Sequence, residues 1–163
     1  SDRQIVAFTR TLVDRLAGTS ARVIVNDRVD LALAAGADGV HLGRDDVPVA
    51  EARRLAPPGF LVGGTCRNAE QARKAKAEGA DYVGVGPVYP TTTKSGLPVP
   101  IGLETLRDAA RVLPAIAISG INAERVPEVM AAGAYGVAVA SAICRSPQPA
   151  MAARGLVDAI ALA

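Results

Sequence analysis

Aromatic residues are scarce in this chain of 163 residues, which contains two phenylalanines, three tyrosines and no tryptophan. Half of the residues are nevertheless hydrophobic, so the core must be built mainly from alanine, valine, leucine and isoleucine. Cores of this kind are common where helices pack closely on a parallel sheet. The length and composition therefore predict a single α/β domain that spans residues 1–163.

Long apolar runs and long basic runs are also missing. No segment approaches the ~18 apolar residues that a membrane-spanning helix needs. The net charge is only +2, and no basic stretch is interleaved with aromatic residues. We therefore expect no membrane and no nucleic acid among the partners, and small anionic ligands suit the slight positive excess.

Cysteine is rare as well, with Cys66 and Cys144 far apart and outside any CxxC motif. Such cysteines are typical of unpaired thiols in a reducing compartment, which predicts a cytoplasmic protein.

Helical and strand patterns alternate along the chain. Amphipathic or capped segments predict helices at 3–17, 28–35, 48–55, 68–78, 103–112, 123–132 and 147–162. Short continuous apolar runs predict strands at 22–26, 39–42, 60–65, 82–86, 115–119 and 136–140.

Three helix starts and faces can be specified further. Ser1 precedes an amphipathic face formed by Ile5, Phe8, Leu12 and Leu16. Asn68 and Gln71 have the spacing of a capping box. Ser146-Pro147 predicts a capping serine followed by a proline in the first helical turn.

A short motif occurs three times, at 35–40 (Ala-Gly-Ala-Asp-Gly-Val), 78–83 (Glu-Gly-Ala-Asp-Tyr-Val) and 132–137 (Ala-Gly-Ala-Tyr-Gly-Val). Each copy ends a predicted helix at a glycine and enters a predicted strand within three residues. A glycine at this place fits the left-handed residue that terminates many helices. The repeat therefore indicates serial βα units with right-handed crossovers.

A series of six βα units permits two architectures, an open doubly wound sheet or a (β/α)8 TIM barrel. The barrel typically needs ~250 residues, and this chain begins with a helix that no strand precedes. We expect the barrel, with the first two βα strands absent from this chain and about six of eight strands present.

Acidic side chains follow two neighbouring predicted strands. Asn26 and Asp27 end the first strand, and Asp45 and Asp46 follow the second. Because ligands of βα folds bind beyond the carboxyl ends of the strands, Asp27 and Asp46 could together hold a hard cation such as Mg2+. Two other interpretations stay open at this point: Asp46 could cap the next helix, and Asp27 could pair with Arg28 or Arg53.

Hydroxyl groups and glycines follow the later strands. The loop Thr91-Thr92-Thr93-Lys94 could bind a phosphate or diphosphate, or it could be a solvated surface loop. The turns at Ser119-Gly120 and Ala140-Ser141 lie where barrels often bind phosphate, although ordinary turns have the same composition.

The only histidine and the first cysteine fit structural roles better than chemical ones. His41 lies inside a strand and has no Cys or His cluster around it in sequence, which is typical of a packed residue. Cys66 follows a strand but has no histidine beside it, so we do not expect a thiolate nucleophile.

Four segments taken together resemble the thiamine-phosphate synthase family. They are 26–28 (Asn-Asp-Arg), 39–46 (Gly-Val-His-Leu-Gly-Arg-Asp-Asp), 86–94 (Gly-Pro-Val-Tyr-Pro-Thr-Thr-Thr-Lys) and 120–122 (Gly-Ile-Asn). The resemblance implies a (β/α)8 barrel that joins 4-amino-5-hydroxymethyl-2-methylpyrimidine diphosphate to a thiazole phosphate. The products would be thiamine phosphate and diphosphate.

The resemblance also implies a role for each matching residue. The implied Mg2+ ligands are Asp27 and Asp46, which together with Lys94 would be the catalytic residues. The implied contacts to the pyrimidine diphosphate are Asn26, Thr65 and Lys94. The implied thiazole-phosphate site consists of Thr91, Thr92, Thr93, Gly120, Ala140 and Ser141. The partners would be small phosphorylated substrates, and a homo-oligomer is compatible with the sequence.

Two departures from the family pattern stand out. Thr65 occupies a position that is usually serine, which keeps the hydroxyl and adds a methyl group. The Gln-x-Arg-Glu-Lys segment that grips the diphosphate in the family has no counterpart here, and by order it should precede Ser1.

Three rival functions share parts of this pattern. A thiazole tautomerase has the same barrel, but some members carry a histidine where this chain has Pro87, and they have less need of the acidic pair. A non-catalytic paralogue that binds thiazole phosphate would tolerate the missing segment. A phosphosugar-processing barrel would explain the phosphate turns but not the three threonines before Lys94.

Overall fold

The computed structural model describes residues 1–93 and 96–163 of the chain. Its helices are α1 (Asp2–Leu16), α2 (Val29–Ala35), α3 (Val49–Leu55), α4 (Ala69–Ala77), α5 (Gly102–Ala110), α6 (Val126–Ala131), α7 (Ser141–Cys144) and α8 (Pro149–Ala161). Its strands are β1 (Ile24–Asn26), β2 (Gly39–Leu42), β3 (Leu61–Cys66), β4 (Tyr82–Val85), β5 (Ala115–Ile118) and β6 (Gly136–Ala138).

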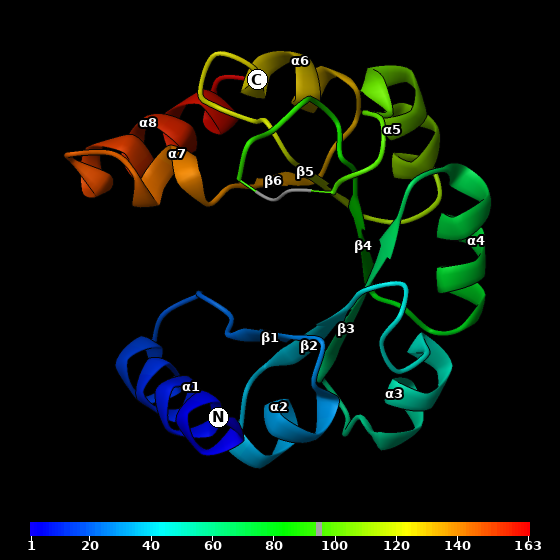
Figure 1. Ribbon diagram of the computed structural model, residues 1–163, viewed down its shortest axis with the longest axis vertical. Coiled ribbons are helices and arrows are strands. Elements are labelled where there is room, and N and C mark those ends of the chain that lie inside the picture. The colour runs from blue at the N-terminus through cyan, green and yellow to red at the C-terminus, as the bar shows by residue number, and fades with distance from the viewer. Residues whose placement is uncertain (94–95) are drawn as a thin grey trace. The chain divides into compact units, whose positions relative to one another are not determined.

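The chain folds into two compact units (Figure 1). Unit one comprises Ser1–Thr65 with Ala75–Tyr82, and unit two comprises Cys66–Lys74 with Val83–Ala163.

In unit one, β1 pairs with β2 and β2 pairs with β3, in parallel and in sequence order. The register places Asn26 beside His41 and His41 beside Gly63. Val40 and Val62 are fully buried, as expected for strands that are covered on both faces.

In unit two, β4 pairs with β5 and β5 pairs with β6, again in parallel and in sequence order. The apolar sides of α5 and α6 supply buried Leu106, Val126 and Val129 to the core. A doubly wound sheet would place strands on both sides of the first strand, whereas the sequential order within each unit is that of a barrel-type series. The α/β class is thus confirmed, and closure into eight strands stays a prediction.

The threefold motif forms the same turn each time. Gly36, Gly79 and Gly133 have φ values of 72°, 93° and 89°. In every copy the alanine after the glycine donates its N–H to the carbonyl five residues earlier, as in Ala37 to Ala32 at 3.0 Å. This is the hydrogen-bonding pattern of a Schellman motif, so the predicted role of the repeat glycine is confirmed.

Two copies of the motif carry an aspartate after Gly-Ala, at Asp38 and Asp81, and its hydrogen bond explains why. The Asp38 carboxylate accepts the Val23 N–H at 2.7 Å, and the Asp81 carboxylate accepts the Val62 N–H at 2.7 Å. Each aspartate therefore satisfies a backbone donor at the start of the preceding strand, and its charge strengthens that bond. The third copy has Tyr135 instead, whose side chain is 74% exposed.

The predicted apolar face of α1 is partly wrong. The N-terminal amine of Ser1 binds the Gln4 side chain at 2.9 Å, so the predicted start is confirmed. However, Phe8 is 65% exposed, whereas Thr9 is buried. The helix packs against α2 (Figure 1) along a stripe rotated from the predicted one, because polar Thr9 lies on the buried side.

The predicted C-terminal helix is confirmed, but its predicted start at Pro147 is two residues too early. It begins at Pro149, with Gln148 as its cap, and Ser146 instead accepts the Gln148 N–H at 3.1 Å. The short helix α7 was not predicted, because four residues are too few to show periodicity. At α4, the Gln71 N–H binds Asn68 as predicted, at 2.9 Å, but the Gln71 side chain accepts the Arg67 N–H rather than that of Asn68.

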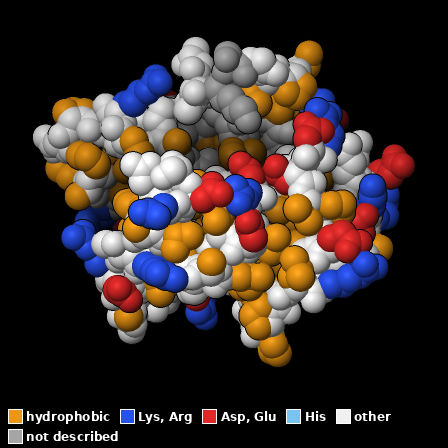
Figure 2. All heavy atoms as spheres, turned by 60° about the horizontal axis from the view of Figure 1, so that its bottom comes forward, with side chains coloured by type: hydrophobic (Ala, Val, Ile, Leu, Met, Phe, Trp, Pro, Cys, Tyr) orange, Lys and Arg blue, Asp and Glu red, His pale blue; other side chains and the backbone are white. Residues whose placement is uncertain are grey.

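None of the described helices is long and apolar enough to cross a membrane. Acidic and basic side chains are interspersed with hydrophobic ones on the face shown in Figure 2.

Candidate functional site

The predicted polar residues of unit one lie at the carboxyl ends of its three strands. Asn26 is the last residue of β1, and Asp27 follows it with a left-handed φ of 68°. The Asp27 N–H donates to the His41 carbonyl of β2 at 2.8 Å, which fixes this unusual conformation against the neighbouring strand. On the loop after β2, Asp46 Oδ2 accepts the Gly43 N–H at 2.6 Å.

His41 connects several of these residues. Its Nε2 lies 3.0 Å from Thr65 Oγ1 of β3, and its ring stacks on Tyr82 with 5.6 Å between the centroids. Burial lowers the pKa of His41 below its ordinary value, and the Asp46 carboxylate opposes this shift. A neutral imidazole at pH 7 can hold the Thr65 hydroxyl in one orientation.

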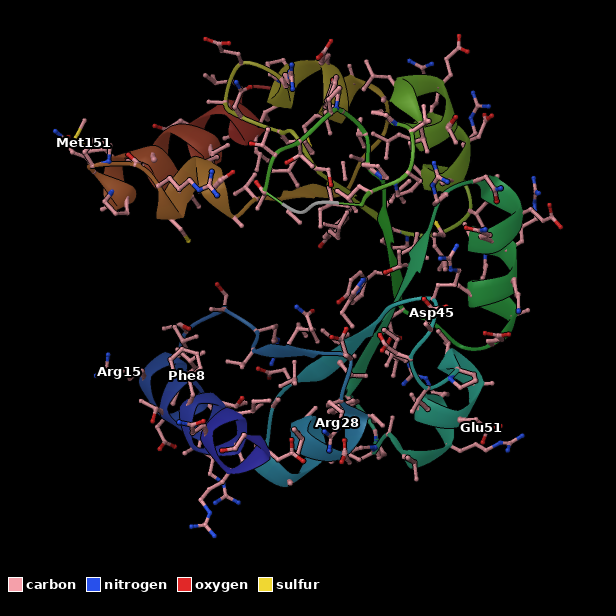
Figure 3. All side chains as sticks on the ribbon, in the orientation of Figure 1. Phe8, Arg15, Arg28, Asp45, Glu51 and Met151 are labelled. Atoms are coloured by element: carbon pink, nitrogen blue, oxygen red, sulfur yellow. The ribbon has the colours of Figure 1, made fainter. Side chains whose placement is uncertain are left out.

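One of the two rival interpretations of the acidic pair, the capping of the next helix by Asp46, is wrong. Helix α3 begins after Pro48 without a side-chain cap, so Asp46 does not cap it. Arg28 pairs with Asp2 and Asp30 (Arg28 is labelled in Figure 3). Arg53 pairs with Asp81 at 2.5 Å in the second copy of the repeat turn.

The donors of unit one fit a hard cation. Asp27 and Asp46 carry carboxylate oxygens and Asn26 a carboxamide oxygen, the types of ligand that Mg2+ prefers, so these residues could hold such an ion. The described residues contain no group of three or more His, Cys, Asp or Glu side chains able to hold a metal. Mg2+ is commonly bound through one or two carboxylates together with substrate phosphates, so a site with two carboxylates suits a phosphorylated substrate.

In unit two, the predicted hydroxyl groups come from two distant segments. Thr93 Oγ1 lies 2.9 Å from Ser141 Oγ across 48 residues of sequence. The Thr93 N–H also donates to Thr91 Oγ1 at 3.2 Å, which turns the loop after β4 back on itself. Three of the residues predicted to bind one phosphate, Thr91, Thr93 and Ser141, are therefore brought together by the loop after β4 and the start of α7.

The turn at Gly120 packs closely against the start of this loop. Gly120 has a φ of 68°. A Cβ atom on Gly120 would lie 2.7 Å from the Cβ of Tyr89, closer than real side-chain atoms approach. The Tyr89 N–H also donates to the Ser119 carbonyl at 3.3 Å. Only glycine fits this position, because a Cβ atom would also lie 2.4 Å from the Pro90 carbonyl oxygen.

The other predicted residues of the site differ in how far the structure describes them. Ala140 is the cap of α7, and Thr92 is exposed on the loop after β4. Lys94 lies outside the described residues. Cys66 is an unpaired, buried thiol whose pKa burial raises to about 11, which agrees with its predicted lack of a nucleophilic role.

Sequence reasoning missed the contacts of His41. The residues that contact His41 belong to other strands, and Thr65 lies 24 residues further along the chain. The one available signal was that this single histidine is the penultimate residue of a predicted strand whose neighbours also end in polar residues.

Known proteins resemble this chain over almost all of its length. A family model described as thiamine monophosphate synthase matches residues 1–143. The thiamine-phosphate synthase of Salinispora arenicola is 46% identical over 162 residues, which cover 98% of this chain and 78% of that protein. The thiamine biosynthesis bifunctional protein ThiM/ThiE of Symbiobacterium thermophilum is 50% identical over 142 residues, which cover 86% of this chain but only 30% of that protein.

A solved structure agrees with these matches. The thiamine phosphate pyrophosphorylase from Pyrococcus furiosus superposes with a TM-score of 0.89 at 35% identity, and the match covers 99% of this chain and 78% of that one. The chain therefore belongs to the thiamine monophosphate synthase family of transferases.

Proposed function

We propose that this protein condenses 4-amino-5-hydroxymethyl-2-methylpyrimidine diphosphate with a thiazole phosphate, releasing diphosphate and forming thiamine phosphate. The observation that carries the proposal is the contact between Thr93 and Ser141. Both hydroxyls belong to the residues expected to bind the thiazole phosphate, and folding brings them within 2.9 Å of each other. Family membership supports the same reaction class. We also propose that the complete fold is a closed (β/α)8 barrel.

In this proposal, unit one binds the pyrimidine diphosphate. Asn26 and Thr65 orient the substrate, and the neutral His41 holds the Thr65 hydroxyl. Asp27 and Asp46 are the metal ligands, and a bound Mg2+ would offset the charge of the departing diphosphate. Lys94 would add a second positive charge at the same leaving group.

Unit two binds the nucleophilic substrate. The hydroxyls of Thr91, Thr92, Thr93 and Ser141 and the backbone at Gly120 and Ala140 hold the thiazole phosphate. The C–O bond to the diphosphate breaks, the electron-rich aminopyrimidine supports the methylene cation, and the thiazole nitrogen then forms the new C–N bond. The chain positions the reactants and stabilises charge, so no protein nucleophile is needed. This agrees with the suppressed ionisation of Cys66.

The proposal is tested by assaying the natural, full-length protein with both substrates, with and without Mg2+. Parent protein should form thiamine phosphate only when Mg2+ is present. Asp27→Ala and Asp46→Asn should each lower kcat at least ~100-fold, because each removes a carboxylate ligand of the Mg2+ that would offset the charge of the leaving group.

Asp45→Asn is the matched control, because Asp45 is the neighbouring acid on the same loop (Figure 3), its side chain is 90% exposed, and its partner is Arg44. It should retain activity within about twofold. Equal losses in Asp45→Asn and Asp46→Asn would refute the metal assignment. Conversion of a thiazole tautomer without condensation would identify a tautomerase instead.

A further inference from the structure

Three side chains of unit two form a connected cluster that the proposed reaction does not use. They are Tyr89 from the loop after β4, Arg125 from the turn before α6, and Glu128 from the first turn of α6. We call this cluster the Tyr89 clamp. Its members are separated by up to 39 residues in sequence, so only the fold brings them together.

Each member of the clamp contacts another directly. The Tyr89 hydroxyl donates to Glu128 Oε1 at 2.5 Å. The guanidinium carbon of Arg125 lies 4.4 Å from the centroid of the Tyr89 ring, which is a cation–π contact. Burial and the Glu128 carboxylate raise the pKa of Tyr89 to about 12, so the hydroxyl keeps its proton at neutral pH.

The clamp also binds the turn of the expected phosphate site. Arg125 Nη1 donates to the Gly120 carbonyl at 2.5 Å. The Arg125 N–H donates to Asn122 Oδ1 at 3.1 Å, which fixes the backbone that leads from Gly120 into α6. One arginine therefore holds the Gly120 peptide at one end of its side chain and the Tyr89 ring across its face.

The position of Tyr89 makes this connection important. Tyr89 lies two residues before Thr91, where the threonine loop begins. Its backbone N–H donates to the Ser119 carbonyl, and its Cβ atom lies where a side chain on Gly120 would be. Any displacement of Tyr89 therefore moves the Gly120 turn and the threonine loop with respect to each other.

We infer that Tyr89, Arg125 and Glu128 are positioning residues that hold the Gly120 turn against the threonine loop and so set the affinity for the thiazole phosphate. This inference rests on the proposed function of the same site. None of the three residues needs to touch the substrate. They fix the distance between two sets of phosphate donors, and preorganisation of this kind improves binding by reducing the ordering cost.

Two variants test the clamp from different sides. Arg125→Met keeps an apolar stem but removes the donor to Gly120 and the charge over the ring. Tyr89→Phe keeps the ring and removes only the bond to Glu128. Arg125→Met should raise KM for the thiazole phosphate roughly 10-fold and Tyr89→Phe roughly 3-fold, in the range expected for the loss of a hydrogen bond to a charged group or to a neutral one. KM for the pyrimidine diphosphate and kcat should stay within about twofold.

Two further variants serve as controls. Arg125→Lys retains one donor for the Gly120 carbonyl but loses the planar stack, so its KM should lie between those of parent and Arg125→Met. Arg111→Met removes an exposed arginine of the same unit that pairs with Asp108, and it should leave both KM values unchanged. Thermal unfolding of every variant measures stability separately.

Calorimetric titration with the thiazole phosphate separates the two proposals. If the parent binds this compound but does not condense it, the proposed function fails, while weaker binding by Arg125→Met still supports the clamp. If Arg125→Met loses stability but keeps its affinity and KM, the cluster is only structural and the inference is overturned. If the parent does not bind the compound at all, both proposals are wrong.

Discussion

Replacing Gly120 by alanine should destabilise the fold and also weaken the thiazole-phosphate site. Gly120 has a φ of 68°, a region that costs an ordinary residue roughly 1–2 kcal/mol. The new Cβ would also lie 2.7 Å from the Tyr89 Cβ, and relief of such overpacking typically costs about 1–3 kcal/mol more. Since the clash falls on the base of the threonine loop, Thr91 must move away from the turn.

Gly36→Ala provides a matched control for the backbone cost. Its φ is 72°, and a Cβ there would meet no atom within 4 Å. Gly36→Ala should therefore lose only the stability that corresponds to the backbone strain. We expect a decrease in Tm of roughly 2–8 °C and unchanged KM values. The decrease in Tm for Gly120→Ala should be about twice as large, and KM for the thiazole phosphate should rise at least ~10-fold.

The two variants are compared by thermal unfolding and by steady-state kinetics with each substrate varied in turn. Equal Tm and equal KM in Gly36→Ala and Gly120→Ala would refute the close packing of Tyr89 on Gly120. A rise in KM for the pyrimidine diphosphate alone would place Gly120 in the other substrate's site.

Two further predictions concern stability and thiol reactivity. Asp38→Asn should lower the free energy of unfolding by about 1–2 kcal/mol at pH 7. The Val23 N–H, followed by Arg22, holds the pKa of Asp38 below its ordinary value of 3.8. The carboxylate's contribution to stability is therefore present above about pH 4 and lost as the pH falls through the folded-state pKa. In urea unfolding, the difference in free energy of unfolding between the parent and Asp38→Asn should be smaller at pH 3 than at pH 7. An undiminished difference would contradict this. Iodoacetamide at pH 8 should modify exposed Cys144 well before Cys66, whose pKa is raised to about 11; mass spectrometry of the labelled peptides measures the ratio, and equal labelling would show that Cys66 is accessible.

Local sequence signals predicted most of the elements because their causes are local. The repeat glycines end helices by adopting a backbone conformation that other residues avoid, and this depends on no distant contact. Strand β2 was predicted with its observed bounds because Gly39 and the polar residues after Leu42 mark both ends. Helix α7 was missed because its four residues bury no apolar face of their own.

The contacts of the site could not be predicted in the same way. The pattern suggested which residue types end each strand, but the bond between His41 and Thr65 depends on the register of β2 and β3. The contact between Thr93 and Ser141 depends on the path of a loop rather than on a strand. The buried stripe of α1 was wrong for a similar reason, since the packing of α2 decided which side of the helix was covered.

The two units contribute different kinds of polar side chain to the proposed sites. The carboxylates of Asp27 and Asp46 belong to unit one, whereas the hydroxyls of Thr93 and Ser141 belong to unit two. The two proposed substrates differ in the same way, because a diphosphate leaving group needs metal ligands and a phosphate monoester needs hydrogen-bond donors. Substitutions in unit one should therefore change mainly the constants for the pyrimidine diphosphate, and those in unit two the constants for the thiazole phosphate. Lys94 is the informative exception, because it belongs to the chain segment of unit two whereas its proposed ligand is the diphosphate. Lys94→Ala should therefore change the constants for the pyrimidine diphosphate rather than those for the thiazole phosphate.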